Sequence, residues 1–465
     1  MPQRNLIILL VAVAVAYACF VRGEQNPFAR YVARSFDTIE ANSLERVPNE
    51  ELFDRALEAM VGVLNKHGDQ HSQFIPSTDA DPFQAEMRQE FGGIGVRIRL
   101  LGDPPELLVV GSPDPGTPAA RAGIRANDRV LAINDTPTDG LDMNQVLRLM
   151  RGKPGESLTL LVRHVDAEQP EKKELVREVI SVDSILGDRR SSDGDWEYRL
   201  EADPRIAQVR VTTFGNKTAD ELRHVVTKLV ADGVQAVVLD LRDDSGGSLD
   251  AAVAICDMFL PAGKKIVEIR GRDDVVEDRY LSTGKGGFAN LPLAVLVNAG
   301  SASASEIVAA CLQDNGRAAV FGERSYGKGT VQQLIPIESG RSLLKLTSAR
   351  YVRPSGKNIH RMADARDEDN WGVSPDAGHE VALAPGEYDV FAKYRSLRDV
   401  WGELPPAEML AAEEAKEQAL AAKGEEVSPS AEFSAGGDFV DRPLAAAFEY
   451  LQRMLDSRAL ESNSA

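Results

Sequence analysis

The spacing between hydrophobic residues along the chain changes near residue 90. Over residues 28–66, apolar side chains recur at three- and four-residue spacing, which predicts helices. Pro48 begins a second helix within this range, and His67-Gly68-Asp69 ends it. From Phe91 onward, short apolar runs separated by glycines and turn residues predict strands.

The strands after Phe91 predict a small β-rich module over residues 89–183. Strands are expected at 95–101, 106–111, 129–133, 157–164 and 173–181, with one helix at 143–150.

From Trp196 the patterns of strand and helix alternate. Strands are expected at 206–211, 234–241, 265–269, 293–297, 318–321 and 331–337, and helices at 219–232, 250–259 and 303–314. The run 234–241 is almost continuously apolar, as parallel strands buried on both faces are. This alternation predicts an α/β core with a mostly parallel sheet. Further helices are expected at 405–427 and 444–455.

The N-terminus has the pattern of an export signal. Arg4 precedes an apolar run from Leu6 to Val21, which is short for a membrane-spanning helix and typical of a secretory signal. Ala16-Tyr17-Ala18 fits a small-residue cleavage site. We therefore expect export to the periplasm or cell envelope, through a cleaved signal or an uncleaved anchor. The alternative is a buried N-terminal helix.

Composition narrows the class of protein. The chain has 465 residues, of which 43% are hydrophobic and 27% charged, and its formal net charge is -19. These values exclude a wholly disordered, collagen-like or polytopic membrane protein. An acidic surface without a basic stripe repels phosphate backbones, so we expect no nucleic-acid partner. Cys256 and Cys311 lack metal-type spacing and are expected to be buried free thiols, and no HExxH pair occurs, so we expect no metal and no cofactor.

One segment has the composition of a catalytic turn. Residues 298–307 follow a predicted buried strand, open a helix and contain Ser301, Ser303 and Ser305. Small residues at such a turn let a substrate backbone approach, and the N–H groups of a helix N-terminus suit a developing oxyanion. The alternative is that the three serines only cap the helix.

A second segment places Lys328 between Gly327 and Gly329. A lysine in a tight glycine turn beside an apolar strand is expected to be desolvated, which lowers its pKa. A neutral lysine can deprotonate a serine, as in the Ser-Lys variant of the catalytic triad. The spacing is not that of a phosphate-binding Walker loop.

Ser-Ala-Ser-Ala-Ser-Glu-Ile, Gln313-Asp314 and Gly327-Lys328-Gly329-Thr330-Val331-Gln332 occur in this order. The chain thereby resembles the carboxyl-terminal processing proteases, also called tail-specific proteases, from about residue 30 to 380. The resemblance implies a crotonase-like serine endopeptidase core with an inserted PDZ domain and no cofactor. It implies Ser303 as nucleophile, Lys328 as general base and Gln332 as the residue that orients the lysine.

Residues 240–247 resemble the family's strand-end loop, which implies an oxyanion hole made by the N–H of Gly246 or Gly247 together with that of Ala304. This chain has Asp244-Ser245 where the family pattern leads us to expect Asn-Pro. Asp314 lies 11 residues beyond Ser303, roughly 16 Å along a helix, so we expect a structural role for it.

The β-rich module resembles a PDZ domain, with residues 91–96 as its carboxylate-binding loop. The resemblance implies that Gly93, Ile94, Gly95 and Val96 bind a substrate C-terminus, which adds to the sheet as a strand. The alternative is a glycine bulge without a ligand.

These observations predict an organisation in five parts. They are a signal or anchor at 1–23, a helical segment at 27–88, a PDZ domain at 89–183, a protease core at 184–380, and a C-terminal helical region and tail at 381–465. The predicted function is cleavage of exported protein or peptide substrates recognised by accessible C-termini. The rival hypothesis is a non-catalytic or latent PDZ scaffold that needs a partner, such as a regulatory adaptor, for activation. The helices at 407–422 and 444–455 are candidate homodimer surfaces, and packing against the core is the alternative.

Overall fold

The computed structural model describes residues 10, 12–15, 17, 26–102, 104–362, 364–366, 368–406, 409 and 439–464. They fall into two compact units, which are described separately. The first comprises residues 1–78 and 333–347, and the second residues 79–332 and 348–465. The predicted leader and the predicted helix at 405–427 lie almost entirely outside the described residues. No helix within the described ranges is long and apolar enough to span a membrane.

The first unit contains the helices predicted over residues 28–66. They are α2 (Pro27–Asn42) and α3 (Asn49–Lys66), and Pro48 caps the second of them. Strand β1 (Gln73–Ile75) pairs antiparallel with β21 (Ser342–Val352). Strands β20 (Thr330–Ile337) and β21 pair with each other and continue into the second unit.

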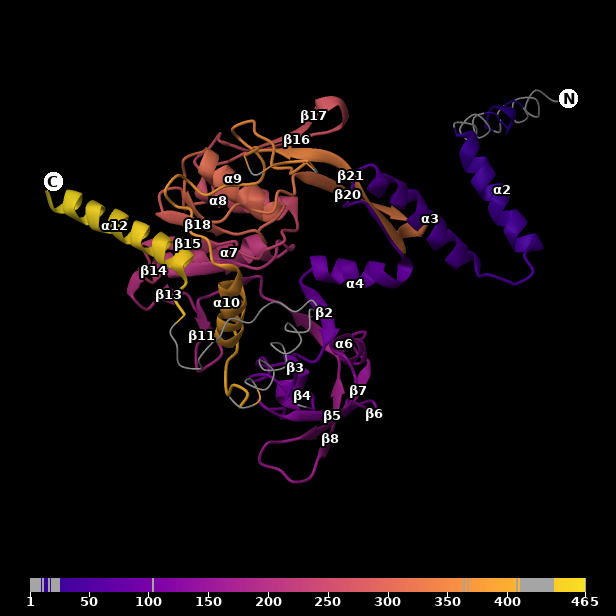
Figure 1. Cartoon of the computed structure of the whole chain (residues 1–465), viewed down its shortest axis with the longest axis horizontal. Helices are drawn as coiled ribbons and strands as arrows, with labels where there is room; N and C mark the ends of the chain where they lie inside the picture. Colours follow the sequence, from indigo (N-terminus) through magenta and orange to yellow (C-terminus); the bar gives the residue numbers. More distant parts are fainter. Residues whose placement is uncertain are drawn as a thin grey trace. The chain divides into compact units, whose positions relative to one another are not determined.

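The β-rich module forms the first part of the second unit (Figure 1). Its sheet has the order β3 (Ile98–Leu101), β4 (Glu106–Val109), β5 (Arg129–Ile133), β7 (Ser157–Arg163), β8 (Glu171–Val176), with β6 (Thr136–Pro137) paired to β5. Strand β2 (Glu90–Gly93) pairs with β9 (Glu178–Ser181), and α5 (Pro118–Arg121) and α6 (Met143–Met150) complete the module. Val146 and Met150 of α6 pack on Val130, Leu160 and Val162 of the sheet.

The α/β core is built on four neighbouring parallel strands. They are β14 (Asp203–Val211), β15 (Ala236–Asp240), β18 (Leu293–Val297) and β19 (Ala319–Gly322). The short strands β10 (Ile185–Leu186) and β13 (Arg199–Leu200) pair antiparallel with β14, so the sheet is mixed. A second, antiparallel sheet contains β16 (Lys265–Arg270), β17 (Val276–Leu281) and β21, and β11 (Arg189–Arg190) pairs with β12 (Trp196–Glu197).

Helices cover both faces of the parallel sheet. Val209, Leu239 and Val295 share a cluster with α7 (Thr218–Ala231), α8 (Leu249–Phe259) and α9 (Ala304–Asp314). The alternate residues Val238 and Leu296 pack on the other face against α12 (Arg442–Ser464). Because side chains alternate across a strand, a strand covered on both faces must be apolar throughout. This arrangement explains the continuous apolar run of β15 and places the loops after β15 and β18 at one edge of the sheet.

Four elements differ from the prediction, and contacts of arginine side chains account for the first two. The strand expected at 173–181 is interrupted at Arg177, whose buried guanidinium donates to the carbonyls of Met150 and Leu149. Helix α10 (Pro385–Arg398) was not predicted, because Arg395 and Arg398 anchor it to Asp188 by ion pairs. Strand β21 was not predicted either, and helix α4 (Ser77–Met87) extended the helical segment.

Packing of α12 on the sheet predicts a strong dependence of stability on its buried residues. Leu451→Ala removes a fully buried side chain, while Leu460 on the same helix is 70% exposed. We expect Leu451→Ala to lower the free energy of unfolding by about 2–4 kcal/mol and Leu460→Ala to change it by less than about 0.5 kcal/mol, measured by urea denaturation. Equal effects of the two substitutions would contradict the packing described here.

Candidate active site

Ser303 stands between strand β18 and helix α9, at the helix N-terminus. Its φ of 55° and ψ of -111° are unusual for a residue with a side chain. Such backbone strain costs about 1–3 kcal/mol and persists only where the surroundings enforce it. Ser303 is 5% exposed.

The three serines of the motif have different partners. Ser301 Oγ donates to the carbonyl of Leu241 at 2.8 Å, and Ser305 Oγ donates to the carbonyl of Asp244 at 3.0 Å. The side chain of Ser303 shares a hydrogen bond with the phenol of Tyr351. Ser301 and Ser305 therefore fasten the turn to the loop after β15, and Ser303 does not.

A buried carboxylate fixes the Ser303 turn to the glycine-lysine loop. Glu306 Oε2 accepts from the backbone N–H of Ser303 and of Lys328, each at 2.8 Å. Its Oε1 accepts from the N–H of Gly327 at 2.7 Å and from Ser325 Oγ at 2.5 Å. The nitrogens of Ser303 and Lys328 thus lie no further apart than twice 2.8 Å. The sequence signal for this contact is a serine followed three residues later by glutamate, the capping-box spacing.

Burial opposes the charge on Glu306. The side chain is fully buried, which raises the pKa of its carboxyl group, and the hydrogen bonds from Ser325 and the three N–H groups offset part of that rise. All four neighbours are donors, so the ionised form matches them best.

Tyr351 on β21 also connects the Ser303 turn with the loop that carries Lys328. Its backbone N–H donates to the carbonyl of Gly329 at 2.8 Å, while its phenol contacts Ser303. Burial raises the pKa of Tyr351 to about 12, so the phenol stays protonated near neutral pH and is a hydrogen-bonding group rather than a base. Sequence reasoning missed this residue because it missed the strand.

The loop that carries Lys328 is closely packed. A Cβ on Gly329 would lie 2.2 Å from the backbone nitrogen of His360, so only glycine fits there. Lys328 is half-buried, and Gln332 Nε2 donates to Thr330 Oγ1 at 2.8 Å. The structure therefore brings the backbones of Ser303 and Lys328 together and holds the Gln332 amide beside Thr330.

The N–H groups predicted to form the oxyanion hole differ in whether they already donate a hydrogen bond. A Cβ on Gly246 would lie 2.8 Å from Ala304 N, so this glycine lies against the helix N-terminus. The N–H of Gly246 donates to Asp244 Oδ1 at 2.8 Å. Within the described ranges no acceptor is recorded for the N–H of Gly247 or Ala304. Of the two predicted glycine donors, Gly246 thus donates its N–H within the loop itself.

The other predicted residues have defined places. Asp314 ends α9 in a two-point ion pair with Arg353, at 2.8 and 2.6 Å. Burial alone would raise the pKa of Asp314, and Arg353 with the N–H of Ser355 lowers it overall. Cys256 and Cys311 are both buried free thiols. No group of three or more His, Cys, Asp or Glu in the part of the chain that the structure describes is placed to hold a metal ion.

The predicted carboxylate-binding loop joins β2 to β3. Ile94 is buried in the module's core, and its carbonyl accepts from Ala119 N–H at 2.9 Å. Gly95 has a φ of 77°, and a Cβ there would lie 2.4 Å from the Thr117 side chain. Strand β3, which follows the loop, lies at the edge of its sheet.

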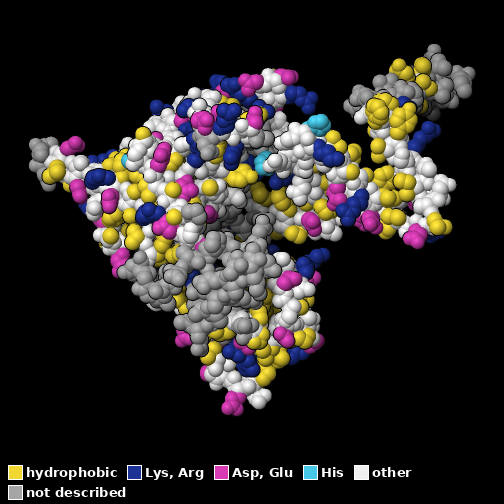
Figure 2. Space-filling model, in the orientation of Figure 1, with side chains coloured by type: hydrophobic (Ala, Val, Ile, Leu, Met, Phe, Trp, Pro, Cys, Tyr) yellow, Lys and Arg dark blue, Asp and Glu magenta, His cyan; other side chains and the backbone are white. Residues whose placement is uncertain are grey.

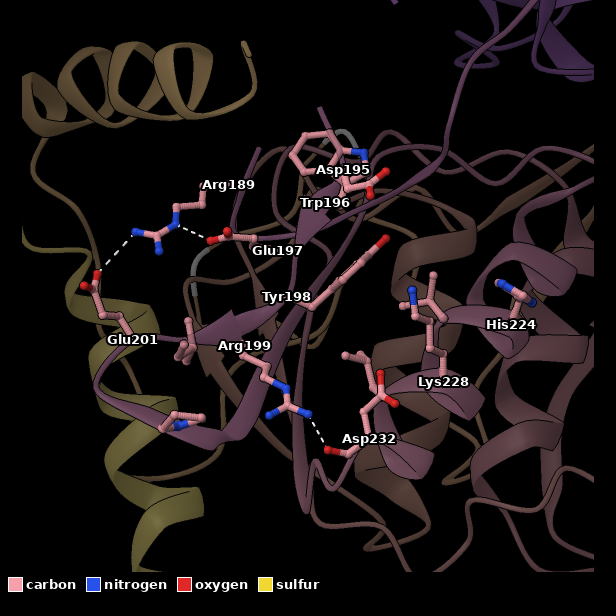
Figure 3. Close-up of a pocket in the computed structure, with 14 residues that line it drawn as sticks. Arg189, Asp195, Trp196, Glu197, Tyr198, Arg199, Glu201, His224, Lys228 and Asp232 are labelled. Carbon is pink, nitrogen blue, oxygen red and sulfur yellow. Dashed lines mark hydrogen bonds and ion pairs between the residues drawn. The ribbon is translucent and has the colours of Figure 1, made fainter. Parts of the chain in front are cut away.

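A cavity of about 700 Å³ lies elsewhere, between β11–β13 and α7 (Figure 3). Its wall contains Trp196 and Tyr198, and Arg189 pairs there with Glu197 at 2.6 Å. None of the predicted catalytic residues lines it. On the face shown in Figure 2, acidic and basic side chains are interspersed.

Comparison with known proteins agrees with the motifs. Residues 205–378 match peptidase family S41, and residues 109–164 match a PDZ domain. The carboxy-terminal-processing protease of Bartonella bacilliformis is 33% identical over 384 residues, covering 81% of each chain. The carboxy-terminal processing protease CtpA of Bacillus subtilis is 27% identical, covering 77% of this chain and 74% of its own. A solved structure of the photosystem II D1 C-terminal processing protease is 25% identical, with a TM-score of 0.42 over 76% of this chain and 92% of its own.

A PDZ module beside a core of peptidase family S41 defines a class of serine proteases. Within that class, the chain belongs to the carboxy-terminal processing protease family.

The position of Glu306 predicts that activity and stability depend on it together. In Glu306→Gln an amide NH₂ replaces one acceptor oxygen and must face two donors in a buried site. We expect a loss of about 2–4 kcal/mol in the free energy of unfolding and a fall of about 100-fold or more in kcat/KM. Urea denaturation and peptide cleavage measure the two effects. A variant that keeps wild-type values of both would show that Glu306 does not hold the site together.

Proposed function

We propose that the protein is an exported serine endopeptidase of the C-terminal processing type, with Ser303 as nucleophile and Lys328 as general base. The observation that carries the proposal is the Glu306 carboxylate, which accepts from the N–H of both residues through one oxygen. A fixed distance between two backbones 25 positions apart is what a nucleophile and its base require. A binding scaffold needs no such constraint.

The reaction follows from these roles. Ser303 Oγ attacks the scissile carbonyl while the Lys328 amine takes its proton and later returns it to the leaving amine. The tetrahedral oxyanion accepts hydrogen bonds from the N–H of Ala304 and of Gly247 or Gly246. Water then hydrolyses the acyl-enzyme. Gln332 orients the lysine in this scheme. The core is proposed to have the crotonase-like arrangement that the family resemblance implies.

The PDZ module is proposed to capture the substrate C-terminus. Residues Gly93–Val96 precede β3, which lies at the edge of its sheet, the position at which a bound peptide adds as a further strand. Substrates are then exported proteins or peptides with accessible C-termini. The second candidate function is a latent form of the same molecule that an adaptor activates. It is favoured by the engagement of the Gly246 N–H with Asp244, which leaves one of the two predicted glycine donors occupied.

Substitution of the three serines separates catalysis from structure. Ser303→Ala should abolish cleavage of an unfolded test protein with an apolar C-terminus and leave the fold intact. Ser301→Ala and Ser305→Ala each lose a buried hydrogen bond, so we expect about 1–2 kcal/mol less stability with cleavage retained.

Lys328→Ala should lower kcat by about a thousandfold or more without loss of substrate binding. Cleavage by Lys328→Ala at the wild-type rate would refute the dyad. Addition of EDTA to each reaction serves as the control for metal dependence.

The PDZ proposal predicts dependence on a free carboxylate. A test peptide with an amidated C-terminus loses the charge that the loop of N–H groups binds, so we expect its KM to rise about tenfold or more. The matched control is the same peptide with an internal amide in place of an internal carboxylate. An equal KM for free and amidated ends would remove C-terminal recognition and leave the peptidase assignment standing.

A further inference from the structure

Asp244 touches both sides of the Ser303 turn. Its carbonyl accepts from the N–H of Ala302 at 2.9 Å and from Ser305 Oγ at 3.0 Å. Its side-chain Oδ1 accepts from the N–H of Gly246, the glycine that lies against Ala304. The carboxyl group is therefore connected, through one glycine, to the backbone N–H groups of the proposed oxyanion site.

The carboxyl group of Asp244 is fully buried, and its Oδ1 accepts the hydrogen bond from Gly246. Among the residues that the structure describes, its Oδ2 has no hydrogen-bond partner, although the residue is 0% exposed. An ionised carboxylate at this position is a charge that has been removed from water without a compensating partner, which costs free energy. A neutral acid keeps the contact of Oδ1 with Gly246 and avoids that cost.

The charged side chains on the surrounding elements form ion pairs or hydrogen bonds with other residues. On the same loop, Arg242 pairs with Asp240 and Asp441. Asp243 accepts from Asn298, and Glu306 on α9 accepts from the N–H groups described above. Lys217, after β14, pairs with Glu90 at 2.6 Å. Burial raises the pKa of Asp244 to about 7, and the hydrogen bonds from the Gly246 N–H and from Ser305 offset part of that rise.

We propose that Asp244 is a positioning residue that orients the oxyanion site through Gly246 and that it serves the reaction only as the neutral acid. The proposal rests on the proposed function. A negative charge on Asp244 repels the negative charge that forms on the tetrahedral oxyanion. At an effective dielectric constant of about 20, two unit charges within about 10 Å change an equilibrium by about tenfold or more.

The test compares two neighbouring aspartates. Asp244→Asn keeps an acceptor for the Gly246 N–H and removes the titration. Asp243→Asn makes the same chemical change at the neighbouring position, which is exposed. The measured quantity is kcat/KM of each variant divided by that of the wild type, from pH 5.5 to 9, because this ratio removes the pH effects that both enzymes share.

The ratio for Asp244→Asn is expected to rise about tenfold or more as the pH increases through about 7. The ratio for Asp243→Asn is expected to stay constant. Asp244→Ser, which also offers an uncharged acceptor, replaces Asp244→Asn if the latter does not fold.

A readout independent of activity uses thermal unfolding. The folded protein keeps a proton on Asp244 that the unfolded chain releases above its ordinary pKa of 3.8, so the wild type loses stability as the pH rises from about 4 to 7. Its Tm should therefore fall relative to that of Asp244→Asn over this range, and Asp243→Asn should not reproduce the difference.

The outcomes separate this inference from the proposed function. An active wild type, an inactive Ser303→Ala and a flat Asp244→Asn ratio would overturn the role of Asp244 alone. A flat ratio together with a pH-dependent Tm difference would also overturn it, since the group would then titrate without affecting the reaction. Absence of cleavage by the wild type at every pH would overturn the proposed function, and this inference with it.

Discussion

The site depends on one buried carboxylate that receives four hydrogen bonds. Glu306 sits on α9, and its partners belong to the Ser303 turn and to residues 325–328. Hydrogen bonds to this one side chain thereby hold two loops without regular structure in one geometry. The free-energy cost of burying the charge is offset only when all four donors are present. Loss of one donor therefore weakens the whole arrangement.

The same principle explains the strained backbone at Ser303. A residue with positive φ relaxes unless its neighbours forbid it. Here its N–H is bound by Glu306, and Ser301 and Ser305 fix the turn on both sides to the loop after β15. Contacts from Glu306 and from the loop after β15 thus maintain the strain, and Ser303 is held at a helix N-terminus.

Much of this arrangement could be predicted from sequence. Periodicity located α9, β15 and β18 closely, because these elements are buried and their patterns are unambiguous. Motif spacing selected Ser303 and Lys328 as candidates, and the family assignment is confirmed. Tyr351 could not be found in this way, since its strand mixes lysine, arginine and serine with apolar residues. The burial of Asp244 was equally out of reach, because it results from loops that meet only in the folded chain.

Helix α12 has a consequence for the order of folding. The parallel strands begin with β14 near residue 203, yet the second face of their sheet is covered by residues beyond 442. Until those residues have been synthesised, Val238, Ala294 and Leu296 present a continuous apolar surface to water. Contacts between such distant parts of a chain form late and slowly. The proteolytic core is therefore completed last, so that folding itself delays the appearance of a protease until most of its own chain has been made.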